Sequence, residues 1–215
     1  MIDLFGIGNA LVDFESKVSE TFLDDHLLEK GHMYLKDDAE IGLVRDKLES
    51  DLKMSSGGSA ANTIYGASGF GLSCAYCGRV QDDEAGGFFV REMKEAGIHL
   101  DDIRQESSHS TSTGNCLVLV TEDAQRTMCT NLGISSELSV EDLNLSRLKS
   151  SGYLYVEGYL AASETGSQAA QRAIEVAEEN GIPVTLTLSD VSMINSFRSD
   201  IEKFCHSQVD TIFCN

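Results

Sequence analysis

The fold depends on the stretch Gly6-Ile7-Gly8-Asn9-Ala10-Leu11-Val12-Asp13, which continues an apolar start of the chain. Paired glycines here favour a dinucleotide-binding turn, but that turn needs a third glycine at Leu11 and a helix directly afterwards. Neither is evident. A polar pair, Asn9 and Asp13, remains among apolar residues. Because a buried carboxylate is costly without hydrogen-bond partners, Asp13 belongs either to a satisfied turn or the surface, or it accepts hydrogen bonds from ligand hydroxyls.

A second polar stretch, Ser55-Ser56-Gly57-Gly58-Ser59-Ala60-Ala61-Asn62, combines two glycines with small residues. Glycines let the backbone turn tightly and approach a ligand closely. Ala60, Ile64 and Ala67 share one helical face, so a helix begins here and its free N–H groups point into the turn. Asn62 in the first turn offers an amide that both donates and accepts hydrogen bonds. A plain loop with close helix packing explains the glycines equally well.

A third stretch, residues 78–87, follows another apolar run and opens a helix that is predicted to reach about residue 97. Asp82, Asp83 and Glu84 suit the N-terminus of that helix, where carboxylates cap free N–H groups and meet a partial positive charge. Capping is a sufficient explanation for these acids, so we do not predict that they bind a metal.

Apolar strand-like runs alternate with helix-like periodicity along the chain. The runs are Ile2–Phe14, Cys74–Val80, Tyr153–Val156, Val184–Leu188 and Thr211–Cys214. The clearest helix is predicted from about Thr165 to Asn180, where alanines recur on one face and glutamates on the other, and Pro183 marks the break after it. This alternation predicts an α/β fold with a parallel sheet and helices on both faces.

Two regions interrupt the alternation, at about residues 15–52 and 113–131. The first contains a short strand-like segment at 31–36. The second predicts a β-hairpin, in which Cys116–Val120 runs into a turn and returns through Arg126–Cys129. These strands do not suit a parallel core and predict a small separate sheet, such as a lid over a pocket. No low-complexity linker flanks them, so the lid would be an insertion and not an independent domain.

Composition narrows the function. The chain has 215 residues and a formal charge of −19. Such an acidic surface argues against nucleic acid and anionic lipid as partners, because both need a basic footprint. No apolar run approaches the ~20 residues of a membrane span, and the start of the chain lacks the basic region of a signal peptide. We therefore expect a cytoplasmic protein without a membrane partner, whose six scattered cysteines are reduced.

Three spaced motifs together resemble the ribokinase-like, or PfkB, family of carbohydrate and nucleoside kinases. The motifs are Gly6-x-Gly8-Asn9-x-x-x-Asp13, Gly57-Gly58-x-x-x-Asn62 and Gly78-x-Val80-x-x-Asp83, in the order and at the separations of the family's N-terminal part. The hairpin from Thr113 to Thr127 is similar to the family's lid strands, and Tyr155–Tyr159 to its strand that ends in glycine above the pocket. The resemblance covers essentially the whole chain and is closer to the adenosine-kinase-like branch than to ribokinase.

The resemblance implies an α/β fold with a doubly wound, mostly parallel sheet, helices on both faces and a small β lid. Residues 1–215 would form the N-terminal portion of the kinase core, with the lid segments inserted and the C-terminal part missing. The family's Gly-Ala-Gly-Asp segment, which holds its catalytic aspartate, does not occur, so no catalytic residue is predicted. Asn215 looks like the first residue of the family's Asn-x-x-Glu motif, which is linked to magnesium and phosphate.

The resemblance also implies a pocket for a small-molecule sugar or nucleoside. Its lining residues would be Asn9, Asp13, Gly57, Gly58, Asn62, Arg126 and Gly158. Asp13 would bind sugar hydroxyls, and Asn62 would hold the same sugar from the glycine turn. Arg126 on the lid either reaches the substrate or forms a surface salt bridge. Gly158 would give the ligand clearance.

The implied reaction is transfer of the γ-phosphoryl group of ATP to a hydroxymethyl group, with Mg²⁺ and, in some relatives, a monovalent cation. Such chemistry relies mainly on positioning and electrostatic stabilisation. Two alternatives remain open: a non-catalytic sugar- or nucleoside-binding module from a truncated or degenerate kinase, and a protein that pairs as a homodimer through lid strands. No metal site is predicted, because Cys74 and Cys77 are three apart on a strand and point to opposite faces.

Overall fold

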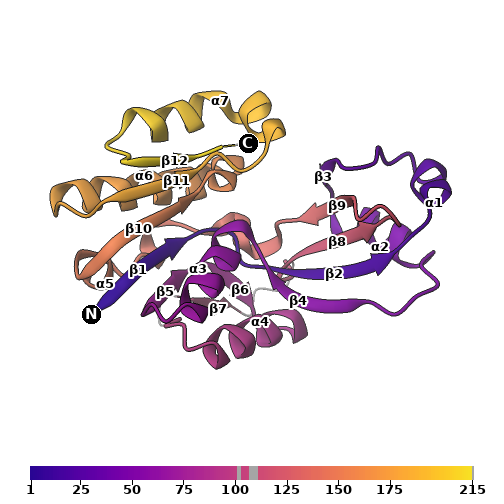
Figure 1. Ribbon diagram of the computed structural model, residues 1–215, viewed down its shortest axis with the longest axis horizontal. Coiled ribbons are helices and arrows are strands. Elements are labelled where there is room, and N and C mark those ends of the chain that lie inside the picture. Colours follow the sequence, from indigo (N-terminus) through magenta and orange to yellow (C-terminus); the bar gives the residue numbers. More distant parts are fainter. Residues whose placement is uncertain (101–102, 107–110, 215) are drawn as a thin grey trace.

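The computed structural model describes residues 1–100, 103–106 and 111–214. The chain forms two five-stranded sheets, and one of them, the core sheet, is entirely parallel, as the alternation of strands and helices predicts (Figure 1). In spatial order the strands are β12 (Thr211–Phe213), β11 (Val184–Thr187), β10 (Ser151–Glu157), β1 (Ile2–Ile7) and β5 (Cys74–Cys77). The doubly wound, mostly parallel α/β architecture is therefore confirmed.

Helices cover this sheet on both faces, and each face has its own hydrophobic cluster. Strand β5 shows the division, because Cys74 and Tyr76 pack into one cluster while Ala75 and Cys77 pack into the other. The helices of the first cluster are α3 (Ser59–Gly69) and α4 (Glu84–Glu95). Those of the second are α5 (Leu145–Lys149), α6 (Glu164–Glu179) and α7 (Val191–His206).

Local signals place several helix ends correctly. Asp83 is the N-cap of α4 and accepts a hydrogen bond from the Gly86 N–H, which confirms its predicted capping role. Helix α6 ends at Asn180, and Gly181 follows with a φ of +66°, the left-handed conformation that glycine adopts without strain. Asp190, which follows β11, caps α7 through the Ser192 N–H.

The prediction of one strand over Ile2–Phe14 is wrong. Strand β1 ends at Ile7, and β2 (Leu11–Lys17) begins a different sheet. The run Cys74–Val80 is likewise divided, because β6 (Arg79–Gln81) lies outside the core sheet and pairs with β7 (Arg104–Glu106). Both breaks fall at a glycine, and the two glycines adjoin: a Cβ on Gly78 would lie 3.1 Å from the carbonyl oxygen of Gly8. Apolar character continues through both breaks, so the sequence pattern does not reveal them.

The second five-stranded sheet forms a lid that extends from the core sheet (Figure 1). Its strands, in spatial order, are β3 (Met33–Leu35), β9 (Arg126–Asn131), β8 (Gly114–Val120), β2 and β4 (Lys53–Gly57). The predicted hairpin is confirmed, since β8 and β9 are antiparallel and Val120 pairs with Arg126. Strands β2 and β4 overlap the two polar stretches of the sequence, at 6–13 and 55–62. These stretches therefore connect the core to the lid.

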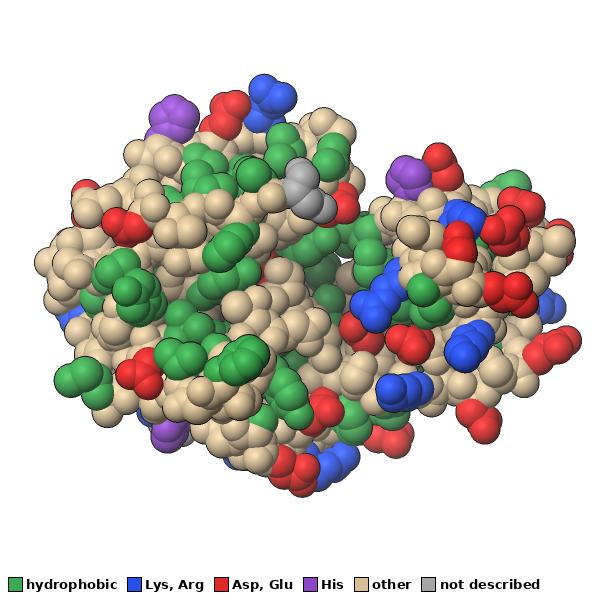
Figure 2. Space-filling model, in the orientation of Figure 1, with side chains coloured by type: hydrophobic (Ala, Val, Ile, Leu, Met, Phe, Trp, Pro, Cys, Tyr) green, Lys and Arg blue, Asp and Glu red, His purple; other side chains and the backbone are tan. Residues whose placement is uncertain are grey.

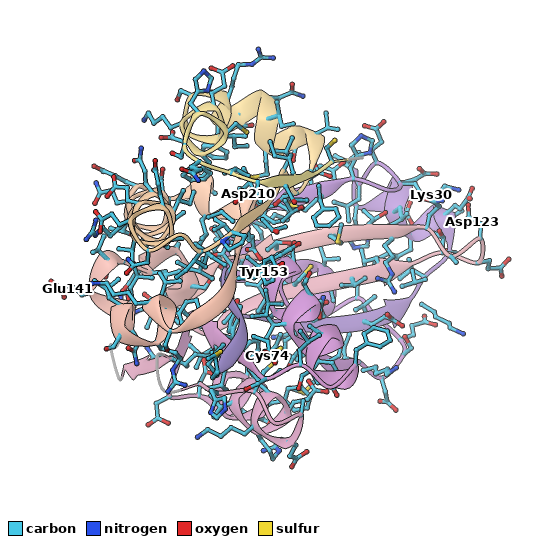
Figure 3. All side chains as sticks on the ribbon, turned by 60° about the vertical axis from the view of Figure 1, so that its left-hand side comes forward. Lys30, Cys74, Asp123, Glu141, Tyr153 and Asp210 are labelled. Carbon is cyan, nitrogen blue, oxygen red and sulfur yellow. The ribbon has the colours of Figure 1, made fainter. Side chains whose placement is uncertain are left out.

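Two short helices, α1 (Glu20–Asp25) and α2 (Asp38–Arg45), cover one face of the lid sheet. Their buried residues form a cluster with those of β8 and β9: Leu23, Leu28, Ile41, Val44, Leu117, Leu119 and Cys129. At the far end of the lid, Lys30 pairs with Asp123 at 2.9 Å (Figure 3). Pairing of two copies through lid strands stays a prediction. Because α1 and α2 cover one face of the lid sheet, such pairing would use its edge strands, β3 and β4.

The order of strands fixes where a ligand site belongs. From β1 the chain reaches β5 on one side and later returns to β10 on the other side, so the winding changes direction between β1 and β10. In open α/β sheets, ligands bind in the crevice at the carboxyl ends of the two strands that flank such a switch point. The relevant ends are Ile7 and Glu157.

No disulfide forms among the cysteines, of which Cys74, Cys77, Cys116 and Cys129 are buried. The helices in the described ranges are all too short or too polar to cross a lipid bilayer.

Candidate functional site

A cavity of about 210 Å³ opens at the switch point, between the core sheet and the lid. Figure 2 shows this side of the molecule hollowed between the two parts, with basic and acidic side chains on the lid side of the hollow. The core contributes Asn9, Gly58, Ser59, Asn62, Glu157 and Tyr159, and the lid side contributes Leu11, Asp13, Met33, Leu35, Cys116, Arg126, Met128, Thr130 and Leu132. Five of the predicted site residues, Asn9, Asp13, Gly58, Asn62 and Arg126, thus meet in one cavity.

Asp13 presents a carboxylate to this cavity from the middle of β2, where it pairs with Ser55 on β4 and Cys116 on β8. Burial raises the pKa of Asp13 to about 6, against the opposing charge of Arg126 and with a small contribution from Glu15. Within the described part of the chain, no group donates a hydrogen bond to its side-chain oxygens. A desolvated carboxylate without a protein partner is able to accept hydrogen bonds from ligand hydroxyls.

The glycine turn brings α3 up to Asp13. Gly57 ends β4 directly against this carboxylate, and a Cβ there would overlap the carboxyl group. Gly58 has a φ of +98°, and a Cβ there would overlap the carbonyl oxygen of Asn9. Helix α3 then begins at Ser59, and the N–H of Asn62 bonds to the carbonyl of Gly58 at 2.9 Å. Gly57 is required by the close approach of Asp13, and Gly58 by its positive φ and its contact with Asn9. The sequence pattern alone did not decide whether these glycines were necessary.

Asn9 lies in the short connection between β1 and β2 and is buried, with 3% of its surface exposed. Its side-chain oxygen accepts a hydrogen bond from the Ser135 hydroxyl at 3.0 Å. Its backbone N–H donates to Oε1 of Glu157, also at 3.0 Å. The residue is therefore held at both its backbone and its side chain on the floor of the cavity.

Glu157 is a site residue that the sequence reasoning missed. It ends β10, is 1% exposed, and accepts a second hydrogen bond at Oε2 from the backbone N–H of Ala60 at 2.6 Å. Burial raises the pKa of Glu157 to about 7, although the N–H groups of Ala60 and Asn9 act in the opposite direction. The available signal was an acidic residue at the carboxyl end of an apolar parallel strand, the place where ligands gather in such sheets.

Arg126 and Gly158 differ in how they relate to the cavity. Arg126 begins β9, lines the cavity and is exposed, and its charge acts on Asp13. It forms no ion pair with any carboxylate of the described residues, and its contact with substrate stays a prediction. Gly158 packs elsewhere: a Cβ on it would lie 2.6 Å from the carbonyl oxygen of Thr187 on β11. Its predicted clearance for a ligand stays a prediction.

Apolar side chains form one wall on the lid side of the cavity. They are Leu11, Met33, Leu35, Met128 and Leu132. Tyr159 faces them from the core, and burial raises the pKa of its phenol. A second hollow of about 310 Å³ adjoins the first, because Asp13, Asn62, Arg126 and Met128 line both. The site therefore combines a polar centre with an apolar wall and has room on both sides of Asp13.

Across residues 1–100, 103–106 and 111–214, no cluster of three or more His, Cys, Asp or Glu side chains is arranged to hold a metal ion. Asn215, the residue predicted to lie near magnesium and phosphate, falls outside the described residues.

Comparison with known proteins decides the family. The model of the pfkB family carbohydrate kinases matches residues 31–215. The chain belongs to the pfkB family. The family match confirms the resemblance to this family, and it includes the glycine-containing motifs at 57–62 and 78–83.

Relatives of this pfkB-family chain include nucleoside kinases. It is 24% identical to the guanosine-inosine kinase of Escherichia coli K12 over 98% of this chain and 50% of that protein. It is also 24% identical to adenosine kinase 1 of Arabidopsis thaliana, over 99% of this chain and 62% of that protein. The chain thus spans about half to three-fifths of these curated relatives.

Among solved structures, the adenosine kinase of Sinorhizobium meliloti superimposes with a TM-score of 0.91 at 31% identity. That alignment covers 99% of this chain and 64% of the other. The match extends over the core sheet and the lid together, so the pfkB-family chain shares the arrangement of both with that kinase.

Proposed function

We propose that the full-length protein transfers the γ-phosphoryl group of ATP to the hydroxymethyl group of a nucleoside. The observation that carries this proposal is the Asp13 carboxylate, which faces the cavity at the switch point and accepts no hydrogen bond from any of the described residues. Membership of a carbohydrate kinase family supplies the reaction class. The nucleoside kinases among the relatives favour a nucleoside as the acceptor.

The polar centre of the cavity suits vicinal hydroxyls. The two oxygens of Asp13 accept hydrogen bonds from two neighbouring hydroxyls, and the amide of Asn62 both donates and accepts beside them. Hydrogen bonds to a charged group contribute roughly 1.5–3 kcal/mol each. A ribose presents its two ring hydroxyls at the required spacing, and its hydroxymethyl group extends away from them.

The apolar wall favours a nucleoside over a free sugar. A free sugar is polar around its whole ring and gains little from contact with Met33, Leu35 and Leu132. A purine or pyrimidine base is flat and largely apolar on its faces, so burial against these side chains contributes to affinity. The adjoining hollow provides further space beside Asp13.

ATP and Mg²⁺ form part of the proposal through the family. When bound, Mg²⁺ would neutralise charge on the transferring phosphoryl group. The described residues offer no ligand set for this ion, so the contribution of this chain is to bind and orient the acceptor and to shield it from water.

The direct test is release of ADP by the full-length protein in the presence of Mg²⁺ and ATP. The acceptor panel should contain adenosine, inosine, guanosine, ribose, fructose and 2-keto-3-deoxygluconate. We expect turnover with at least one nucleoside and much weaker turnover with free ribose. Turnover of a free sugar alone would contradict the assignment of the apolar wall, and silence across the panel would contradict the kinase proposal. Nucleoside binding without turnover would instead support the non-catalytic binding module.

A further inference from the structure

We infer that Glu157 is a positioning residue, whose carboxylate joins the loop that carries Asn9 to the first turn of α3, which carries Asn62. This inference rests on the proposed function, because it concerns the same nucleoside site. Glu157 acts through its neighbours and not by touching the substrate. Its role is to fix the distance between two groups that line the cavity but belong to separate segments of the chain.

The geometry uses both oxygens of the carboxylate. Oε1 accepts the N–H of Asn9 at 3.0 Å, and Oε2 accepts the N–H of Ala60 at 2.6 Å. Glu157 itself is 1% exposed, so its side chain is enclosed even though it forms part of the cavity floor. Ala60 is in the first turn of α3, where free N–H groups and the helix dipole favour a negative charge. A carboxylate is thus well suited to close both segments onto the end of β10.

The surrounding chain packs closely around the Glu157 carboxylate. The three segments are far apart along the chain, since Asn9 and Ala60 precede Glu157 by 148 and 97 residues. A Cβ on Gly8 would lie 2.6 Å from Oε2 of Glu157 and 2.7 Å from the Cβ of Ala60. The glycine therefore lets β1 pass directly beside the carboxylate.

Two phenols interact electrostatically with Glu157. Tyr76 on β5 is completely buried, and burial raises its pKa well above the usual value. Tyr159 on the 3₁₀ turn Gly158–Ala162 also has its pKa raised by burial. Both remain neutral between pH 5 and 9. Asp13 lines the same cavity and has a pKa of about 6, close to the value of about 7 for Glu157, so Glu157→Gln is needed to assign the titration to Glu157.

Two substitutions separate charge from reach. In Glu157→Gln the amide keeps one acceptor oxygen, but its NH₂ group faces a backbone N–H, so one of the two hydrogen bonds is lost. In Glu157→Asp the charge remains, but the side chain is one methylene shorter and does not reach both N–H groups. Asp142→Asn is the matched control, because Asp142 is a buried carboxylate that accepts the backbone N–H of Ser139 outside the cavity.

The experiment measures adenosine binding by calorimetry at pH 8 together with backbone amide spectra of the chain as pH is varied. We expect both Glu157 variants to melt cooperatively and to bind adenosine about tenfold or more weakly, because a hydrogen bond to a charged group is lost at each. Asp142→Asn should bind as the natural chain does. In the natural chain, the amide resonances of Asn9 and Ala60 should shift together near pH 7, and this shift should vanish in Glu157→Gln.

Two results would overturn the inference. One is adenosine binding within about twofold of the natural chain in both Glu157 variants, since a factor of ten corresponds to 1.4 kcal/mol. The other is an absence of a shared titration at the Asn9 and Ala60 amides. If the natural chain binds no nucleoside at all, the proposed function fails, and the amide titration still decides whether the carboxylate joins the two segments.

Discussion

Replacing Gly58 with alanine perturbs the turn that connects the lid to the first turn of α3. Gly58 has a φ of +98°, which an alanine adopts only with strain of about 1–3 kcal/mol. Its new Cβ would also overlap the carbonyl oxygen of Asn9, a backbone atom that does not rotate away. Overpacking of this kind costs a further ~1–3 kcal/mol. We therefore expect the free energy of unfolding to fall by at least about 2 kcal/mol, or roughly 4–8 °C in Tm for a domain of this size.

Gly71→Ala is the control for backbone strain alone. Gly71 has a φ of +93°, close to that of Gly58, but a Cβ on Gly71 meets no atom within 4 Å. The assay compares thermal melts and adenosine affinities of the two variants. Gly58→Ala should be the less stable of the two, and it alone should lose affinity, by about tenfold or more, because the turn next to Asn9 and Asn62 must move.

The reasoning fails if the two alanine variants have the same Tm and the same affinity for adenosine. Equal values would mean that the turn accommodates a Cβ without moving Asn9. The close approach of Gly58 to that carbonyl would then have no bearing on the site.

Three further predictions test separate parts of the account. Gly8→Ala should weaken adenosine binding about as much as Glu157→Gln does, because its Cβ would lie 2.6 Å from the carboxylate; calorimetry measures this, and unchanged affinity would contradict the close packing. Gly66→Ala, at an exposed position inside α3 with no atom near the new Cβ, should stabilise the chain by about 0.5–1 kcal/mol in urea melts, and destabilisation would show that the helix is not regular there. Burial in the folded chain raises the pKa of Asp13 from 3.8 to about 6, so the stability contributed by its protonated form is complete below pH 4 and is lost as pH rises through 6. The free energy of unfolding of Asp13→Asn should therefore rise by up to about 3 kcal/mol relative to that of the natural chain between pH 4 and pH 7. A difference that stays constant with pH would refute the desolvation of Asp13.

Sequence reasoning recovered the fold where local signals and burial agree. The capping residue Asp83, the break after α6 and the hairpin of β8 and β9 each depend on residues close together in the chain. It failed at the boundary between β1 and β2, because apolar residues predominate on both sides of the break and the pattern shows no change of sheet. There the chain leaves the core sheet at Gly8, next to contacts made by Glu157 from β10, a strand that is far away in sequence.

The candidate site was recovered in part for the same reason. Asp13 and Asn62 were recognisable as polar residues beside glycines, and the structure brings them to one cavity. Glu157 was missed because its importance comes from partners at Asn9 and Ala60 that no local pattern indicates. The apolar wall from the lid was also hidden, since Met33 and Leu35 sit in a strand too short to show alternation.

The most direct test of the account is a calorimetric titration of adenosine into the natural chain and into Asp13→Asn. Glu122→Gln, at an exposed position in the turn between β8 and β9, serves as the control. We predict saturable binding by the natural chain and the control, and an affinity about 10- to 100-fold lower for Asp13→Asn, because hydrogen bonds to a charged acceptor contribute roughly 1.5–3 kcal/mol. Equal affinity in Asp13→Asn and the natural chain would show that this carboxylate does not hold the nucleoside.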